Sequence, residues 1–164
     1  MSIALFALTL ASCQLGQIQS AVADPMKFGA LTATDLNGKR YALPGEFNGG
    51  PVLCVVSRSD KDRDEARRVS LMKADLETNF PTLSVYELYF TSTPEPLGVI
   101  VTNATERPYV LTTPFPGDSW LESAGLAKHT TPVVVVVRND GTVTKYKPTS
   151  LLTTREDVVA FVEG

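Results

Sequence analysis

Cysteine and histidine are scarce in this chain of 164 residues, which contains two cysteines and one histidine. Cys13, Cys54 and His129 are too few for the usual zinc sites built from these residue types, and the two cysteines do not form a CxxC pair. The composition therefore excludes most Cys/His metal sites. We predict neither a metal nor a cofactor.

The chain also lacks a block of charge of either sign. It has 15 Lys and Arg against 18 Asp and Glu, for a net charge of -3. Without a basic stretch interleaved with aromatic residues, nucleic acid is excluded as a partner. Asp60, Asp62 and Asp64 alternate as in a calcium loop, but the sixth position is Glu65 instead of Gly and the twelfth is Leu71 instead of Glu. Calcium binding is therefore excluded as well.

No apolar run is long enough to span a bilayer. The run at residues 3–11 suits the core of an export signal instead. Residues 10–13 resemble a bacterial lipobox, in which Cys13 would be lipidated, whereas Ala21-Val22-Ala23 before Asp24 fits ordinary signal cleavage. Both processing sites stay open. We predict a targeting segment and linker at residues 1–23 and one folded domain at residues 24–164.

Five consecutive valines at residues 133–137 are the strongest structural signal in the chain. A short β-branched run of this kind predicts a strand buried on both faces, as is common in α/β proteins. The turn sequence at residues 139–141 and the alternation at residues 142–146 predict a hairpin partner. A proline directly before such a strand cannot donate to the ladder. We therefore predict a cis peptide bond before Pro132, which would present backbone to a partner.

Alternation, turn residues and helical spacing predict the other elements. The helix at residues 64–79 is indicated by an apolar stripe through Val69, Met72 and Leu76. A capping box of Ser119 with Glu122 predicts a short helix ending at Gly125. Further strands are expected at residues 28–36, 39–43, 51–56 and 83–90, short strands at 99–101 and 109–111, and a last helix after Thr154, capped with Asp157.

The order of these elements resembles the thioredoxin-like superfamily in its redoxin branch, which holds peroxiredoxins and periplasmic thiol-disulfide oxidoreductases. Three pieces carry the resemblance. Residues 35–43 look like the family's N-terminal hairpin, residues 46–53 look like the lead into its first core strand, and Gly125-Leu126 with Thr131-Pro132 and Asp140-Gly141 look like its cis-proline hairpin. The resemblance implies an α/β fold with a central mixed β-sheet flanked by helices.

The chemistry of that family does not carry over to this sequence. Its redox cysteines lie in the loop and first helical turn after the first core strand, where the corresponding residues 57–64 contain none. Thiol exchange requires a thiolate nucleophile. We therefore predict a redox-inactive protein-binding or assembly module of the bacterial envelope, periplasmic or lipid-anchored. Its partner would be a protein or peptide, and it would touch the membrane only through an anchor at Cys13. The predicted partner-binding residues are Arg58, Asp60, Lys61, Arg63, Trp120, Thr131 and Pro132.

Cys54 leaves an enzymatic alternative open. It lies within the apolar strand, two residues before the loop, where a small buried hydrophobic side chain is the usual role. A reactive Cys54 would instead indicate a thiol-disulfide oxidoreductase or a one-cysteine, peroxiredoxin-like antioxidant enzyme. We predict no other catalytic residue.

Overall fold

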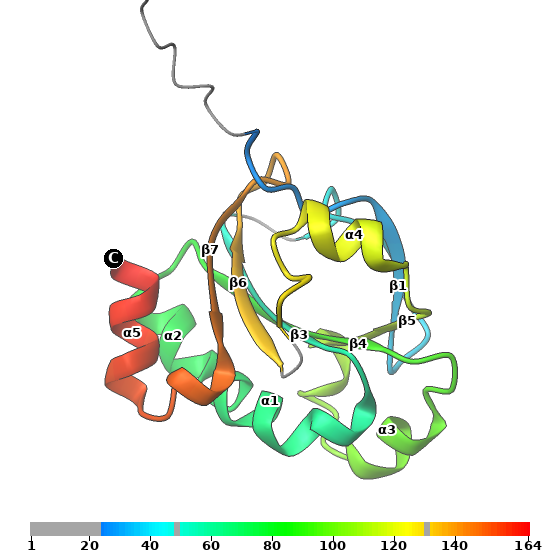
Figure 1. Ribbon diagram of the computed structural model, residues 1–164. Helices are drawn as coiled ribbons and strands as arrows, with labels where there is room; N and C mark the ends of the chain where they lie inside the picture. The colour runs from blue at the N-terminus through cyan, green and yellow to red at the C-terminus, as the bar shows by residue number, and fades with distance from the viewer. Residues whose placement is uncertain (1–23, 48–49, 130–131) are drawn as a thin grey trace, which may run out of the picture.

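A seven-stranded mixed sheet forms the centre of the protein in the computed structural model, which describes residues 24–47, 50–129 and 132–164 (Figure 1). The strands are β1 (Leu31–Asp35), β2 (Arg40–Leu43), β3 (Val52–Ser57), β4 (Ser84–Phe90), β5 (Val110–Thr113), β6 (Val133–Val137) and β7 (Val143–Pro148). The helices are α1 (Arg63–Ser70), α2 (Lys73–Asn79), α3 (Glu95–Ile100), α4 (Asp118–Ser123) and α5 (Arg155–Glu163). Short 3-10 turns span Asp60–Asp62, Arg107–Tyr109 and Thr149–Leu151.

The strand order is β2-β1-β5-β4-β3-β6-β7. Strands β3, β4 and β5 are parallel to one another, and the remaining neighbours pair antiparallel. Helix α4 lies over one face, while α1, α2, α3 and α5 pack against the other (Figure 1). We call the two resulting layers the α4-side core and the α1-side core. This architecture confirms the predicted α/β fold with a mixed sheet flanked by helices.

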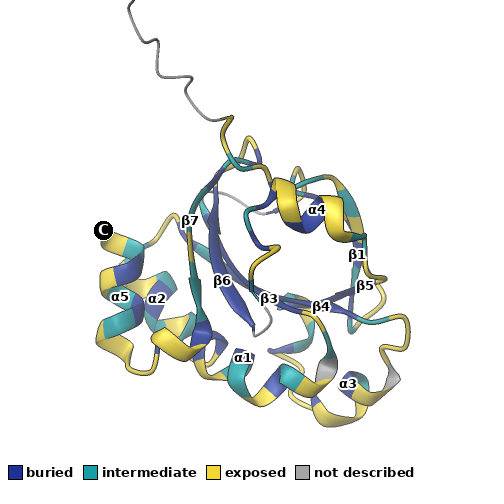
Figure 2. Cartoon of the chain, viewed as in Figure 1, coloured by how far each residue is buried: buried dark blue, intermediate teal, exposed yellow. Residues whose placement is uncertain are grey.

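The side chains of the valine strand β6 contribute to both cores. Val133, Val135 and Val137 point into the α4-side core, whereas Val134 and Val136 point into the α1-side core. Successive side chains of a strand face opposite sides of a sheet, so a strand covered on both faces is apolar throughout. Figure 2 shows β6 and β3 buried along their length. The prediction of a doubly buried strand is confirmed, with β6 placed between β3 and β7.

The two predicted hairpins are also confirmed. Gly38 closes the turn between β1 and β2 with a φ of 89°, and Gly141 closes the turn between β6 and β7 with a φ of 79°. Both values lie in the left-handed region that favours glycine. Each turn is tied by an aspartate: Asp35 accepts from the backbone N–H of Asn37, and Asp140 accepts from that of Thr142.

The prediction of one continuous helix at residues 64–79 is wrong. The structure divides it into α1 and α2, and Met72 between them donates to the carbonyl of Val69, a 3-10 type bond. Both sides of the break are tied to β4, because Ser70 donates to Glu87 and the Lys73 ammonium donates to the carbonyl of Val85. These ties hold the two helices in directions that one straight helix cannot follow.

Residues 99–101 do not form the short strand that their apolar character suggested. Val99 and Ile100 instead end helix α3, and Val101 is its C-cap. The first turn of this helix contains a proline, a position that proline favours. Leu97 is the residue that α3 buries, whereas Val99 is 75% exposed. The short strand expected around residue 110 is present as β5.

One of the two predicted capping boxes is present. Thr154 accepts from the backbone N–H of Asp157 while the Asp157 carboxylate accepts from the Thr154 N–H, as a capping box requires. Ser119 does not cap α4. That helix starts one residue earlier and its N-cap is Gly117, without a side-chain cap. Gly125, with a φ of 73°, ends the segment as expected.

The predicted cis bond before Pro132 lies outside the described residues, because it involves Thr131. Pro132 itself is buried, and its carbonyl accepts from both the backbone N–H and the hydroxyl of Thr149 at 2.9 Å. The Leu43–Pro44 bond is cis.

Candidate functional site

The loop between β3 and α1 is the place where the thioredoxin-like family carries its redox cysteines. Here it begins after Ser57, the last residue of β3, continues through the 3-10 turn and leads into α1 at Arg63. Arg58 and Lys61 are exposed in it, as expected for a partner-binding surface. The side chain of Asp60 and the whole of Thr131 lie outside the described part of the structure.

Pro132 is buried, and two further predicted partner-binding residues, Arg63 and Trp120, are also buried instead of exposed, which corrects the assignment of all three. Arg63 turns inward beneath α1, and its side chain is only 6% exposed. Trp120 packs edge-on against Phe28 and Phe90, with ring centroids 5.0 and 5.5 Å apart, and its indole N–H donates to the carbonyl of Gly29 at 2.8 Å. Trp120 is therefore a member of the α4-side core. Neither side chain is available to a partner in this conformation.

Cys54 lies in the middle of β3 and is completely buried. Its neighbours in the sheet are Tyr86 on β4 and Val135 on β6, and its side chain belongs to the α4-side core. Burial, and to a smaller degree the negative charge of Glu87, raise the pKa of the Cys54 thiol above its ordinary value. A neutral thiol without solvent contact is a poor nucleophile.

The β3 end of the α4-side core reaches the surface beside the family's active-site position. Arg58 and His129 line the same small cavity there, of about 10 Å³. His129 also lies edge-on to Tyr146, with ring centroids 5.3 Å apart. Apolar side chains complete the cavity lining: Val56, Phe90, Leu121, Leu126 and Val133. The ends of β3 and β6 thus bring one predicted residue, Arg58, next to the chain's single histidine.

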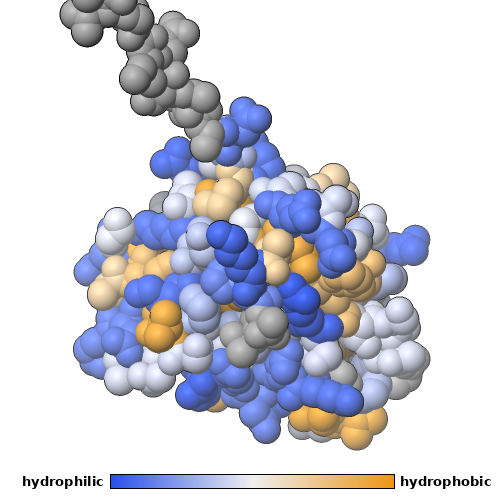
Figure 3. Space-filling model, in the orientation of Figure 1, coloured by the Kyte–Doolittle hydropathy of each residue, from blue (hydrophilic) through white to orange (hydrophobic). Residues whose placement is uncertain are grey.

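Exposed apolar side chains do not form a broad surface on the face shown in Figure 3. Most of that face is hydrophilic, and the hydrophobic colour gathers in small separate patches. Phe115 is half exposed and stacks edge-on against Phe90 at 5.6 Å, so one aromatic side chain lies near the cavity just described.

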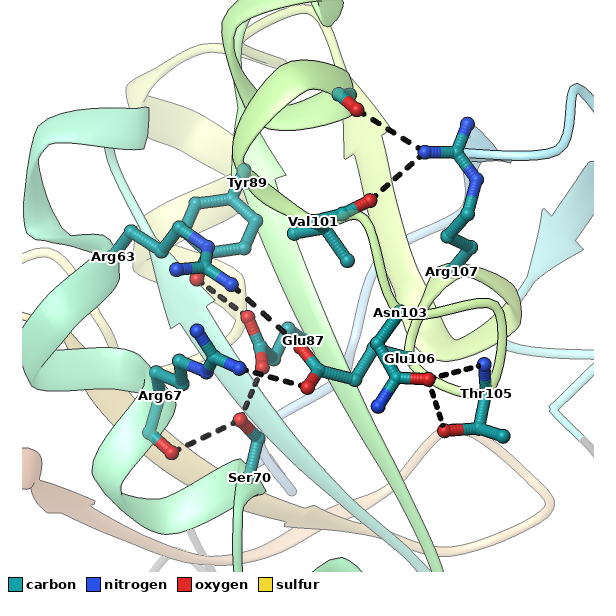
Figure 4. Close-up of polar contacts among 11 residues, drawn as sticks. Arg63, Arg67, Ser70, Glu87, Tyr89, Val101, Asn103, Thr105, Glu106 and Arg107 are labelled. Atoms are coloured by element: carbon teal, nitrogen blue, oxygen red, sulfur yellow. Dashed lines mark hydrogen bonds and ion pairs between the residues drawn. The ribbon is translucent and has the colours of Figure 1, made fainter.

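A buried polar network under α1 is the main feature that the sequence interpretation missed (Figure 4). Glu87, on β4, is 1% exposed within the α1-side layer. One carboxylate oxygen accepts from the hydroxyl of Ser70, and the other accepts from the phenol of Tyr89 at 2.5 Å. Burial raises the pKa of Glu87, against the opposing effects of these two hydrogen bonds and of the positive charge of Arg63. Burial also raises the pKa of Tyr89.

Two arginines and a second glutamate complete this network. Arg67 donates to Glu106 at 2.7 Å, and the Arg63 guanidinium lies 3.7 Å from the same carboxylate. Glu106 is 8% exposed and comes from the proline-rich segment before β5. The network therefore joins helix α1, strand β4 and the segment leading into β5. A cavity of about 250 Å³, lined in part by Ser70, Glu106 and Tyr109, opens beside it.

One signal in the sequence pointed to this network. Glu87 is the single charged residue in the apolar run at residues 83–90, and an ionisable residue at such a position is rarely buried without partners. Its partners could not be identified, since Arg63 and Arg67 occur in a stretch of mixed charge that is typical of a solvated helix face.

Within the described ranges, no cluster of three or more His, Cys, Asp or Glu side chains is arranged to hold a metal ion. Among the same residues, no helix has both the length and the apolar character needed to cross a membrane.

No protein-family model matches the sequence, and no curated protein matches it either. Solved structures do match the fold. The exposed lipoprotein thioredoxin Etrx1 of Streptococcus pneumoniae has a TM-score of 0.56 and 11% identity, covering 82% of this chain and 98% of that chain. The thioredoxin domain of a thiol-disulfide oxidoreductase from Bacteroides vulgatus has a TM-score of 0.56 and 17% identity, covering 84% and 93%.

A third similar structure is BsSco, a member of the Sco family of cytochrome c oxidase assembly proteins. Its TM-score is 0.56 and its identity 15%, covering 85% of this chain and 92% of that chain. At these identities the likenesses establish the fold alone. The chain has a thioredoxin-like fold, which confirms the resemblance that the sequence suggested.

Proposed function

We propose that this protein is an exported thioredoxin-fold module of the bacterial envelope that binds or helps to assemble other polypeptides without thiol redox chemistry. The observation that carries the proposal is the location of Cys54. Its thiol is completely buried in the centre of the sheet, and burial raises its pKa. Exchange or peroxide reduction needs an accessible thiolate.

The loop after β3 supports the same proposal. Residues 57–64 contain no cysteine, and the first residue of α1 is a buried arginine that pairs with Glu106. The start of α1 is thus occupied by an ionic network at the position where the family has its thiols. The chemistry of this helix terminus differs from that of a thiol oxidoreductase, although the surrounding fold is similar.

An assembly role has a precedent among the similar structures. The Sco family is named for cytochrome c oxidase assembly, and another similar structure is an exposed lipoprotein. Fold similarity does not fix function, so these proteins show only that the fold serves such roles. The surface that we propose for partner binding consists of Arg58, Lys61, His129 and Phe115.

Export of this chain is part of the proposal and is tested separately. Lipidation at Cys13 and cleavage after Ala23 give products of different mass, because only the first keeps residues 13–23 and a lipid. Mass spectrometry of the intact protein from a bacterial envelope fraction distinguishes them. An unprocessed chain confined to the cytoplasm would contradict export.

The reactivity of Cys54 tests the absence of thiol chemistry. We expect the native protein to react with a maleimide or with hydrogen peroxide only after unfolding, since the thiol has no solvent contact. An Arg58→Cys variant is the matched control, because it places a thiol on the exposed loop and should react in the native state. Rapid modification of Cys54 in the native protein would favour the enzymatic alternative, a thiol-disulfide oxidoreductase or one-cysteine peroxidase.

Binding to an unfolded polypeptide tests the positive part of the proposal. A reduced and alkylated model protein serves as the probe, and its affinity is measured by fluorescence anisotropy. Arg58→Glu should weaken binding, whereas Arg40→Glu on the distant edge strand β2 should not. Equal effects of the two charge reversals would mean that the loop after β3 is not the binding surface.

A further inference from the structure

Four buried side-chain atoms in the described residues lack a hydrogen-bond partner, and they come from the last residue of β3 and from helix α1. They are Ser57 Oγ, Arg63 Nε, Arg63 Nη2 and Arg67 Nε. Each of these atoms carries a hydrogen that it can donate. Buried donors are usually paired, because leaving one unpaired costs roughly 1–3 kcal/mol. Several unpaired donors in one region would be stabilised by a ligand that accepts hydrogen bonds.

Arg63 offers the geometry that an oxyanion requires. Nε and Nη2 form one edge of the guanidinium, and this edge matches two oxygens of a carboxylate or phosphate group. Glu106 Oε2 is 3.7 Å from Arg63 Nη2, which is too long for a hydrogen bond. The Glu106 carboxylate is instead bonded to Arg67 at 2.7 Å. The edge of Arg63 is therefore held in the interior without an acceptor.

Ser57 and Arg63 lie on the same side of the sheet. Ser57 is the register partner of Tyr89 on the neighbouring parallel strand, so both side chains project to the α1 side. The positive charge of Arg63 lowers the pKa of Tyr89 and Glu87 against the larger effect of burial. Figure 4 shows the Arg63 guanidinium beside the Tyr89 ring.

The charges beneath α1 favour an anion. Two guanidinium groups face the carboxylate of Glu106 and that of Glu87, and burial of Glu87 favours its neutral form. When Glu87 holds a proton, the four groups carry one more positive than negative charge. A compact anion would remove that excess.

We infer that Ser57, Arg63 and Arg67 form a binding site for one compact oxyanion, a phosphate or carboxylate group, under the first two turns of α1. The Arg63 edge binds two oxygens of the anion, while Arg67 Nε and the Ser57 hydroxyl each donate one further hydrogen bond. The anion reaches the site from the Arg67 side, where the side chain is 32% exposed. This inference does not depend on the proposed role in polypeptide binding.

Arginine side-chain NMR on the unaltered protein tests the site directly. The Nε–H resonances are followed during titration with inorganic phosphate, and separately with acetate, at constant ionic strength maintained with chloride. We expect the Arg63 and Arg67 signals to shift and saturate, while those of Arg58 and Arg68 drift without saturation. The probe with the lower dissociation constant identifies the preferred group. If the surface arginines respond and Arg63 does not, the interaction is that of an adventitious ion only, and the inference is wrong.

Substitutions test the two-oxygen geometry. Arg63→Lys keeps the charge and removes the planar edge, so we expect phosphate or acetate to bind about tenfold more weakly. Arg68→Lys, on the exposed side of the same helix, is the matched control and should bind as the wild type does. Equal affinity of the Arg63→Lys variant would overturn the inference. If that variant does not fold, the resonance titration of the unaltered protein still decides the question.

Discussion

The two sides of β3 and β4 differ sharply, although they are built from alternating residues of the same strands. On the α4 side, Cys54, Tyr86 and Leu88 pack in an apolar layer. On the α1 side, the same strands present Ser57, Glu87 and Tyr89 to helix α1, and the layer contains two arginines and a second glutamate. The chain thus keeps its lone described thiol in an apolar environment and concentrates its buried charge next to the helix terminus. The comparison teaches that the helix following the cysteine-free loop adjoins a charged interior, and not simply a filled apolar core.

The largest expected effect comes from Glu106→Ala on the charged side. Removing this carboxylate leaves Arg63 and Arg67 without their common partner, and breaking a buried ion pair typically costs about 3 kcal/mol or more in the free energy of unfolding. Urea denaturation measures the change. Glu122→Ala on the exposed face of α4 is the control and should change stability by less than about 0.5 kcal/mol. A loss below about 1 kcal/mol for Glu106→Ala would show that the arginines do not depend on it.

A smaller effect is expected from Cys54→Ser on the apolar side. The serine hydroxyl would be buried among apolar side chains, which costs roughly 1–3 kcal/mol when it finds no hydrogen-bond partner. Cys54→Ala is the matched comparison, since it removes the sulfur without adding a polar group, and it should cost about 1 kcal/mol. Urea denaturation of both variants gives the difference. If serine were tolerated better than alanine, the environment of residue 54 would be more polar than the structure indicates.

The α1 side should also make the stability of the protein depend on pH, through Glu87. The pKa of Glu87 in the folded protein is raised above its ordinary 4.5, so between the two values the folded state binds more protons than the unfolded state. The contribution of Glu87 to stability is therefore full below pH 4.5 and falls as pH rises through the folded-state pKa. Glu87→Gln cannot ionise and should lose this dependence.

We therefore expect the unfolding free energy of Glu87→Gln, relative to wild type, to increase as pH rises from about 4 to about 7, by at most roughly 1.4 kcal/mol per pH unit. Denaturant unfolding at several pH values measures the difference, in which the other carboxyl groups cancel. A difference that stays constant with pH would mean that the pKa of Glu87 is the same in the folded and unfolded states, which would contradict the raised pKa.

Ser57→Ala should have the smallest effect. The Ser57 hydroxyl is buried without a partner, so its removal loses no hydrogen bond and should leave stability within about 0.5 kcal/mol of wild type in a buffer of chloride alone. Addition of phosphate sharpens the test, because the wild type should then gain more stability than the variant. A clear loss without any oxyanion would reveal a protein partner for this hydroxyl.

Much of the fold could be predicted because local patterns and tertiary structure agree. The valine strand, the glycines at positions 38 and 141 and the Thr154 cap each follow from short-range sequence rules. The helix break near residue 71 could not be found in this way, because it is enforced by the bonds of Ser70 and Lys73 to β4.

The site was less accessible to sequence reasoning for a similar reason. Arg58 lies on the surface as predicted. Arg63 occurs in the same mixed-charge stretch but turns inward to Glu106, which is distant in the sequence. The sequence shows that a residue is charged, but only the fold shows with which opposite charge it forms an ion pair. Trp120 is a second such case, since it was predicted at the surface but its ring packs in the α4-side core and its indole N–H donates to the carbonyl of Gly29.

The alternation of β6 between the two layers has a mechanical consequence. Because neighbouring valines of one strand pack into opposite cores, displacement of β6 from the sheet would disrupt the packing of both. The layer that encloses Cys54 and the layer that holds the charged network therefore share this strand. The protein should unfold as one cooperative unit, with the amides of β3 and β6 exchanging with solvent last.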